Sequence, residues 1–60
     1  MIEIKAFYKW RKVESREEAL RFAKCMYERI RTTSDPVKMA ALVNKIHVRG
    51  TVFTVDELRA

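Results

Sequence analysis

The stretch SREEALRFAKCMYERIR, Ser15–Arg31, decides the fold of this 60-residue chain. It begins with a serine whose hydroxyl can cap the free N–H groups of a helix, and Glu18, three residues further on, can reach back to that cap. Apolar side chains then recur at intervals of three and four residues, which predicts an amphipathic helix of about four to five turns. These side chains are Ala19, Leu20, Phe22, Ala23, Met26, Tyr27 and Ile30.

Residues 2–10, before this helix, alternate between two kinds of side chain. Such alternation is typical of a half-buried strand, because successive side chains of a strand point to opposite faces. We therefore predict one N-terminal strand. The side chains expected on its core face are Ile2, Ile4, Ala6, Tyr8 and Trp10, and those expected on its outer face are Lys5, Phe7, Lys9 and Arg11.

A second helix is predicted after Asp35 and Pro36, a capping residue followed by a proline at the first helical position. Its large apolar side chains, Met39, Leu42, Val43 and Ile46, form a stripe, while Ala41 lies on another side. A helix that is apolar on more than one side is buried on more than one side, which favours a subunit interface on this helix.

The C-terminal residues carry a turn signal, a short β-like run and a second capping pattern. Gly50, the only glycine, is expected to end the second helix or the short segment after it. Residues 51–53 are predicted to form a short strand that pairs with residues 2–9; the alternative is that residues 51–55 lead directly into the last helical turn. Thr54 and Glu57 repeat the capping-box spacing, so a final helical turn is expected from Val55 to Arg59.

These elements predict a single small α+β domain over residues 1–60, with the order β-α-α-β and a final helical turn. A chain of this length buries only about 60% of its unfolded surface, so its own core is small. One cysteine cannot form an internal disulfide. We therefore expect a homodimer.

The residue inventory argues against catalysis and against a bound cofactor. Cys25 and His47 are the only cysteine and histidine, fewer than the four ligands of a structural zinc site, and a nucleophilic cysteine needs an oriented base beside it. A single glycine leaves no phosphate-cradling loop. We expect no enzyme activity, no metal and no cofactor.

The charge balance favours an acidic partner. Thirteen Lys and Arg against eight Asp and Glu give a net charge of +5 and a pI of about 9.8. Nucleic acid and an acidic protein surface both fit this balance. The lone cysteine and the absence of a signal-like or membrane-spanning run suggest a cytoplasmic protein that does not enter a membrane.

The run from Lys5 to Lys12 is the candidate nucleic-acid site, because it interleaves four cations with three aromatic residues. Cations neutralise phosphates, and exposed rings stack on bases. The predicted site residues are Lys5, Phe7, Lys9, Arg11 and Lys12. Tyr8 and Trp10 are expected in the core instead.

The order strand, helix, helix over residues 6–48 resembles ribbon-helix-helix repressors. In that family two chains pair their strands and lay the ribbon in the major groove of DNA. The resemblance implies that Lys5, Phe7, Lys9 and Arg11 lie near bases. The sequence departs from the family in its long strand, in the lack of a glycine after the first helix and in the additional residues 50–60.

A second hypothesis is a protein-interaction module or inhibitor that docks on an acidic partner. The apolar second helix and the C-terminal apolar residues exceed what one small core needs, which favours this alternative. The predicted interface residues are Met39, Leu42, Val43, Ile46 and Phe53.

Overall fold

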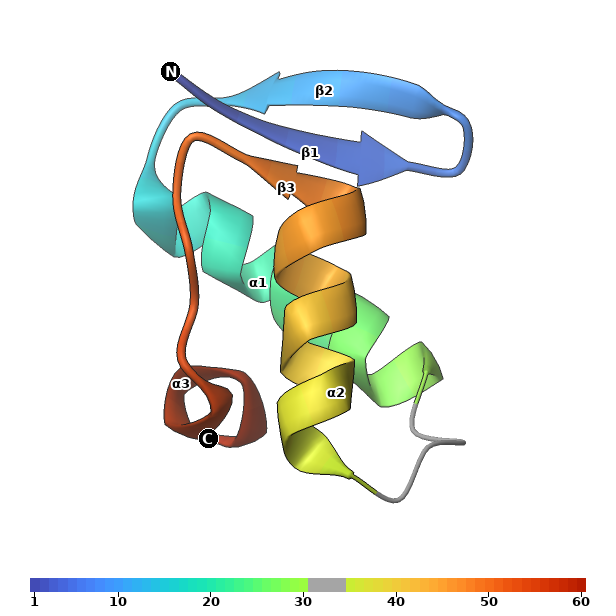
Figure 1. The fold of residues 1–60 in the computed structure, drawn as a ribbon. Coiled ribbons are helices and arrows are strands. Elements are labelled where there is room, and N and C mark those ends of the chain that lie inside the picture. The colour runs from blue at the N-terminus through green and yellow to red at the C-terminus, as the bar shows by residue number, and fades with distance from the viewer. Residues whose placement is uncertain (31–34) are drawn as a thin grey trace.

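In the computed structural model, which describes residues 1–30 and 35–60, a three-stranded antiparallel sheet lies over a layer of helices (Figure 1). The elements in chain order are β1 (Ile2–Ala6), β2 (Lys9–Val13), α1 (Arg16–Arg29), α2 (Pro36–Leu42), the π-helical η1 (Val43–His47), β3 (Val48–Arg49) and α3 (Val55–Arg59). The strand order is β2-β1-β3. The α+β class is confirmed. Arg31, at the end of the predicted first helix, lies outside the described residues.

Helix α1 begins and packs as its sequence predicts. The Ser15 Oγ accepts a hydrogen bond from the Glu18 N–H at 3.2 Å, and the Glu18 carboxylate accepts one from the Glu14 N–H at 3.4 Å. The carboxylate thus reaches one residue further back than in a standard capping box. The predicted apolar side supplies buried side chains to the core, while Phe22 stays 38% exposed at its margin.

The predicted single N-terminal strand is wrong, because residues 2–13 form a hairpin. Ala6 pairs with Lys9, so Phe7 and Tyr8 alone make the turn, and Phe7 has a φ of 59°. A positive φ at a two-residue hairpin turn usually calls for Gly, Asn or Asp, and a Phe-Tyr turn therefore carries no turn signal in the sequence.

The turn also reverses which side chains of β2 face the helices. Directly paired residues of antiparallel strands point to the same face, so Val13 joins Ile2 on the helix side, whereas Trp10 joins Lys5 on the outer side. The prediction that Tyr8 and Trp10 lie in the core is therefore wrong. Tyr8 is 94% exposed in the turn.

The second helix begins at the predicted cap, where the Asp35 carboxylate accepts a hydrogen bond from the Val37 N–H at 3.0 Å. It continues to His47, but its last five residues are π-helical. This stretch carries Asn44, whose side-chain amide donates to the Phe53 carbonyl at 2.7 Å and whose carbonyl accepts from the Phe53 N–H at 2.8 Å.

The predicted strand at residues 51–53 is wrong, and the strand that pairs with β1 lies earlier, at Val48–Arg49. Gly50 follows it with a φ of +90°, and a Cβ there would collide with the backbone carbonyl of Met1. Glycine is the residue that meets both conditions. After Gly50 the chain leaves the sheet, and the backbone of Phe53 makes its hydrogen bonds with the Asn44 side chain.

A single arginine fastens the C-terminal segment to the start of α1. The Arg16 guanidinium makes two hydrogen bonds to the Glu57 carboxylate at 2.7 and 3.0 Å, one to the Val52 carbonyl at 3.0 Å and one to the Thr51 hydroxyl at 3.2 Å. It also lies 4.7 Å from the centroid of the Phe53 ring. Helix α3 follows with the predicted capping box between Thr54 and Glu57, which is confirmed.

The chain closes its own core between the sheet and the helices. The buried apolar residues are Ile4, Val13, Ala19, Ala23, Tyr27, Met39, Ala40, Val43, Val48, Phe53 and Leu58. The central strand β1 has both neighbours, β2 and β3, from the same chain. The topology therefore differs from the ribbon-helix-helix fold, in which the corresponding strand pairs with a second chain.

Candidate nucleic-acid interface

The outer face of the sheet lies open, since the described helices all lie on its other side (Figure 1). The strand register assigns five side chains to this open face: Glu3, Lys5, Trp10, Lys12 and Arg49. Lys12 and Arg49 are exposed, whereas Lys5 and Trp10 are half-buried. The open face thus carries three cations, one carboxylate and one large aromatic ring.

Trp10 and Arg49 connect the two edge strands across β1. The Arg49 guanidinium carbon lies 3.8 Å from the centroid of the Trp10 ring, within the range of a cation–π interaction. The planar guanidinium keeps its charge in this position, because arginine is not deprotonated in proteins. The pair therefore offers an aromatic surface and a fixed positive charge in one place.

His47 lies next to the open face, at the end of η1. Partial burial, and secondly the positive charge of Lys5, lower the pKa of His47 below its ordinary value of 6.5. This lowering of the pKa favours the neutral imidazole over the charged form, so His47 is not counted among the cations of the face. The positive charge along β1 and β2 comes from Lys5 and Lys12.

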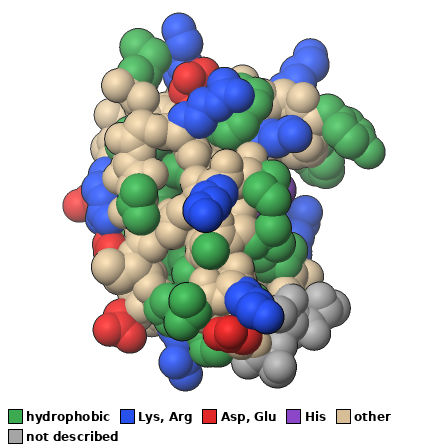
Figure 2. Space-filling model, viewed as in Figure 1, with side chains coloured by type: hydrophobic (Ala, Val, Ile, Leu, Met, Phe, Trp, Pro, Cys, Tyr) green, Lys and Arg blue, Asp and Glu red, His purple; other side chains and the backbone are tan. Residues whose placement is uncertain are grey.

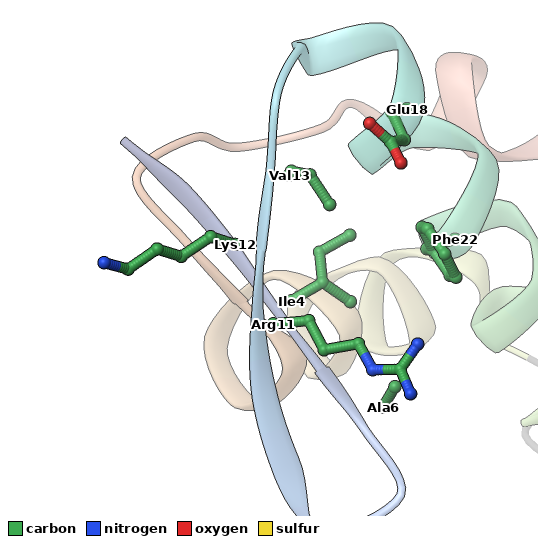
Figure 3. Close-up of a pocket in the computed structure, with 7 residues that line it drawn as sticks. All are labelled: Ile4, Ala6, Arg11, Lys12, Val13, Glu18 and Phe22. Atoms are coloured by element: carbon green, nitrogen blue, oxygen red, sulfur yellow. The ribbon is translucent and has the colours of Figure 1, made fainter.

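The five predicted site residues are divided between three places. Lys5 and Lys12 lie on the open face, Lys9 and Arg11 lie on the helix side of β2, and Phe7 lies in the hairpin turn. Figure 3 shows the division directly, because Arg11 and Lys12 point to opposite sides of β2.

Arg11 lines a shallow cleft between the sheet edge and α1 (Figure 3). Its volume is about 140 Å³, and Phe22 and Glu18 form its helix side. This volume is below the range of about 300–1,000 Å³ that is typical of small-molecule sites. The cleft therefore does not suggest a substrate pocket.

The predicted interface residues are also divided. Met39, Val43 and Phe53 belong to the core of the single chain, with exposed fractions of 4%, 0% and 2%. Leu42 and Ile46 are 37% and 46% exposed. A contact with a second molecule at this helix can therefore use only these two of the five.

Sequence reasoning missed Trp10 and Arg49 as candidate site residues. Trp10 was assigned to the core because the alternation was continued through the turn. Arg49 lies on a strand of two residues, which is too short to give a periodic signal. In Figure 2, Lys and Arg side chains stand at the top of the molecule, where the sheet lies, and apolar side chains stand beside them at both ends.

Within residues 1–30 and 35–60, no three His, Cys, Asp or Glu side chains gather where they could hold a metal ion, and Cys25 is exposed. In the same part of the chain, each helix is too short or too polar to cross a bilayer. Comparison of the chain with protein-family models, curated proteins and solved structures finds no match.

Proposed function

We propose that this protein is a non-enzymatic regulatory protein that binds nucleic acid through the open face of its sheet. The observation that carries the proposal is the contact between Trp10 and Arg49, flanked by Lys5 and Lys12, on a face that the described helices leave uncovered. Cations on such a face neutralise phosphates, and an aromatic ring among them can meet a base or a sugar.

The size of the open face sets the expected strength of binding. Neighbouring strands lie about 4.8 Å apart, so three strands span about 10 Å, which suits a short segment of nucleic acid. Three cations imply about three neutralised phosphates. For a single strand, the logarithm of the binding constant should then fall with the logarithm of salt concentration with a slope of about −2.

The test compares two pairs of cations on the same hairpin. Lys5→Gln with Lys12→Gln removes two charges from the open face, and Lys9→Gln with Arg11→Gln removes two from the helix side. Both variants have a formal net charge of +3 in place of +5. Because phosphate contacts are local, we expect at least a tenfold loss of affinity for the first variant and less than about threefold for the second.

Fluorescence anisotropy with labelled oligonucleotides at about 50 and 150 mM salt measures these affinities. Circular dichroism checks that both variants stay folded. Equal losses in the two variants would mean that only net charge matters, and the open face would be rejected as the site. Absence of binding at the lower salt concentration would reject nucleic acid as the ligand and leave an acidic protein partner on the same face.

Self-association, or docking of a protein partner, is the second candidate, and Leu42 and Ile46 favour it. They lie four residues apart in the second helix and both remain exposed. Such a pair shares one helix face and can pack against a second copy of the chain. The solution mass of the intact chain tests this candidate, and a monomer at high concentration would reject the homodimer.

A further inference from the structure

The hairpin turn displays two adjacent aromatic side chains almost completely to solvent. Phe7 is 84% exposed and Tyr8 is 94% exposed. Phe7 also has a φ of 59°, a conformation that is rare for a bulky residue. The ring therefore occupies a strained position without contributing to the core. Strained, exposed positions of this kind occur at ligand-binding sites more often than elsewhere.

The turn continues the open face at one end. Tyr8 is two residues from Trp10, which corresponds to about 7 Å along a strand. Lys5 pairs with Trp10, and its next neighbour in the register, Ala6, leads directly into the turn. Lys5 is therefore the cation of the open face nearest to the turn, two residues from Phe7, while Lys12 and Arg49 are both paired with Glu3, two residues further along β1.

The chemistry of this extended surface distinguishes between forms of nucleic acid. A ring can stack only on a base that is not already stacked inside a duplex. A duplex reader instead places hydrogen-bonding side chains against base edges in a groove, commonly Arg, Asn or Gln. The open face and the turn carry three aromatic rings, three cations and Glu3, and neither Asn nor Gln is present there. Arg49 is the one side chain of these duplex-reading types, and its guanidinium lies against the Trp10 ring.

We infer that the ligand is single-stranded nucleic acid, whose bases stack on Phe7 and Tyr8 while its phosphates meet Lys5, Lys12 and Arg49. This inference rests on the proposed function and adds the class of ligand and two residues that bind it. The main competing arrangement is insertion of the β1–β2 hairpin into the major groove of a duplex, as two-stranded ribbons do.

The experiment uses the full chain with a labelled 12-nucleotide single strand and with the same strand annealed to its complement. The single strand should bind at least tenfold more tightly than the duplex at about 50 mM salt, because only unpaired bases can stack on the rings. Trp10 is the only tryptophan, so its fluorescence reports occupancy of the open face without a label on the protein.

The decisive variant is Phe7→Ala with Tyr8→Ala, which removes both rings and leaves the charge unchanged. Stacking on one ring contributes about 1–3 kcal/mol, so we expect at least a tenfold loss of affinity for the single strand. The matched control is Val37→Ala with Val52→Ala, two exposed apolar residues outside the hairpin, 66% and 70% exposed, which should change the affinity less than twofold. A second variant, Phe7→Gly with Tyr8→Ala, also removes both rings. Its glycine adopts the positive φ of position 7 without steric strain, so the turn can keep its conformation.

The outcomes separate this inference from the proposed function. The inference would be overturned if the duplex bound as tightly as the single strand, or if the ring variants bound with unchanged affinity. In either case the Lys5→Gln with Lys12→Gln variant would still test the open face by itself. Absence of binding to either form would overturn both. A loss confined to the single strand in the ring variants would support the inference.

Discussion

The β1–β2 hairpin and the C-terminal segment after Gly50 differ in whether their aromatic and charged side chains are used within the fold or face solvent. In the C-terminal segment, Phe53 is buried, and Glu57 serves both the capping box and Arg16. In the hairpin, Phe7 and Tyr8 face solvent, and Lys12 is exposed on the open face. The C-terminal segment thus uses its aromatic ring in the core, whereas the hairpin contributes Ile4 and Val13 to the core and leaves the two rings of its turn outside it.

Under the proposed function, this difference would let a 60-residue chain combine stability with a binding surface. A domain of this size has a total stability on the order of 3–9 kcal/mol, so it cannot leave many aromatic side chains unused. The C-terminal segment is stabilised by the two hydrogen bonds between the Phe53 backbone and the Asn44 side chain. The two exposed rings of the hairpin contribute little burial to the fold, and we have assigned them to a ligand.

The largest expected contrast comes from the same substitution in the two regions. Phe53→Ala removes a ring that is 2% exposed and should cost about 3–5 kcal/mol, a large fraction of the total stability. Phe7→Ala removes a ring that is 84% exposed and should change stability by less than about 0.5 kcal/mol. Urea unfolding of both variants measures the difference, and similar losses would show that the hairpin aromatics support the fold.

A smaller effect of opposite sign is expected for Phe7→Gly. Glycine adopts a positive φ without a steric penalty, so this variant should gain up to about 1 kcal/mol of stability, or a few degrees in Tm. If the ligand is a single strand that stacks on Phe7, this variant should at the same time lose affinity for single-stranded nucleic acid. Thermal unfolding measures the stability of this variant, and fluorescence anisotropy on the same preparation measures its affinity. A glycine variant less stable than the natural chain would show that the positive φ of Phe7 is not strained.

The smallest effect concerns acid stability. Hydrogen bonds from the Arg16 side chain and then from the Thr54 backbone lower the pKa of Glu57 from its ordinary value of 4.5 to about 2. A depressed carboxyl pKa stabilises the folded state above pH 4.5, and this contribution is lost as the pH falls toward 2.

The comparison variant is Glu57→Gln, which cannot ionise. The difference in Tm between the natural chain and this variant should be largest at pH 6 and should narrow toward pH 2. Because the pair is partly exposed, high salt should also reduce the difference. A difference that stays constant with pH would show that the Arg16–Glu57 pair does not contribute through charge.

Local signals in the sequence were sufficient for the helices and their caps. Ser15, Asp35 and the Thr54–Glu57 pair each mark a helix start that the structure confirms, because capping depends on residues a few positions apart. The apolar spacing in α1 likewise identified its buried side. These features require no knowledge of distant parts of the chain.

The sheet could not be predicted in the same way, because it depends on pairing between distant residues. The Phe7–Tyr8 turn lacks the usual turn residues, and β3 has only two residues. Its neighbour in the sheet, β1, supplies the pairing that defines it. The division of the predicted site between two faces follows from this one unpredicted turn, since it sets which side of β2 each cation occupies.

The contact between Trp10 and Arg49 brings together residues from opposite ends of the chain. The open face consequently exists only while β3 is paired with β1, and the unfolded chain offers its cations without this arrangement. A ligand that binds only the folded form shifts the folding equilibrium, by about 2.7 kcal/mol when its concentration is 100 times Kd. For a domain of marginal stability, the concentration of the ligand would thus help to determine how much of the protein is folded and how fast proteases remove it.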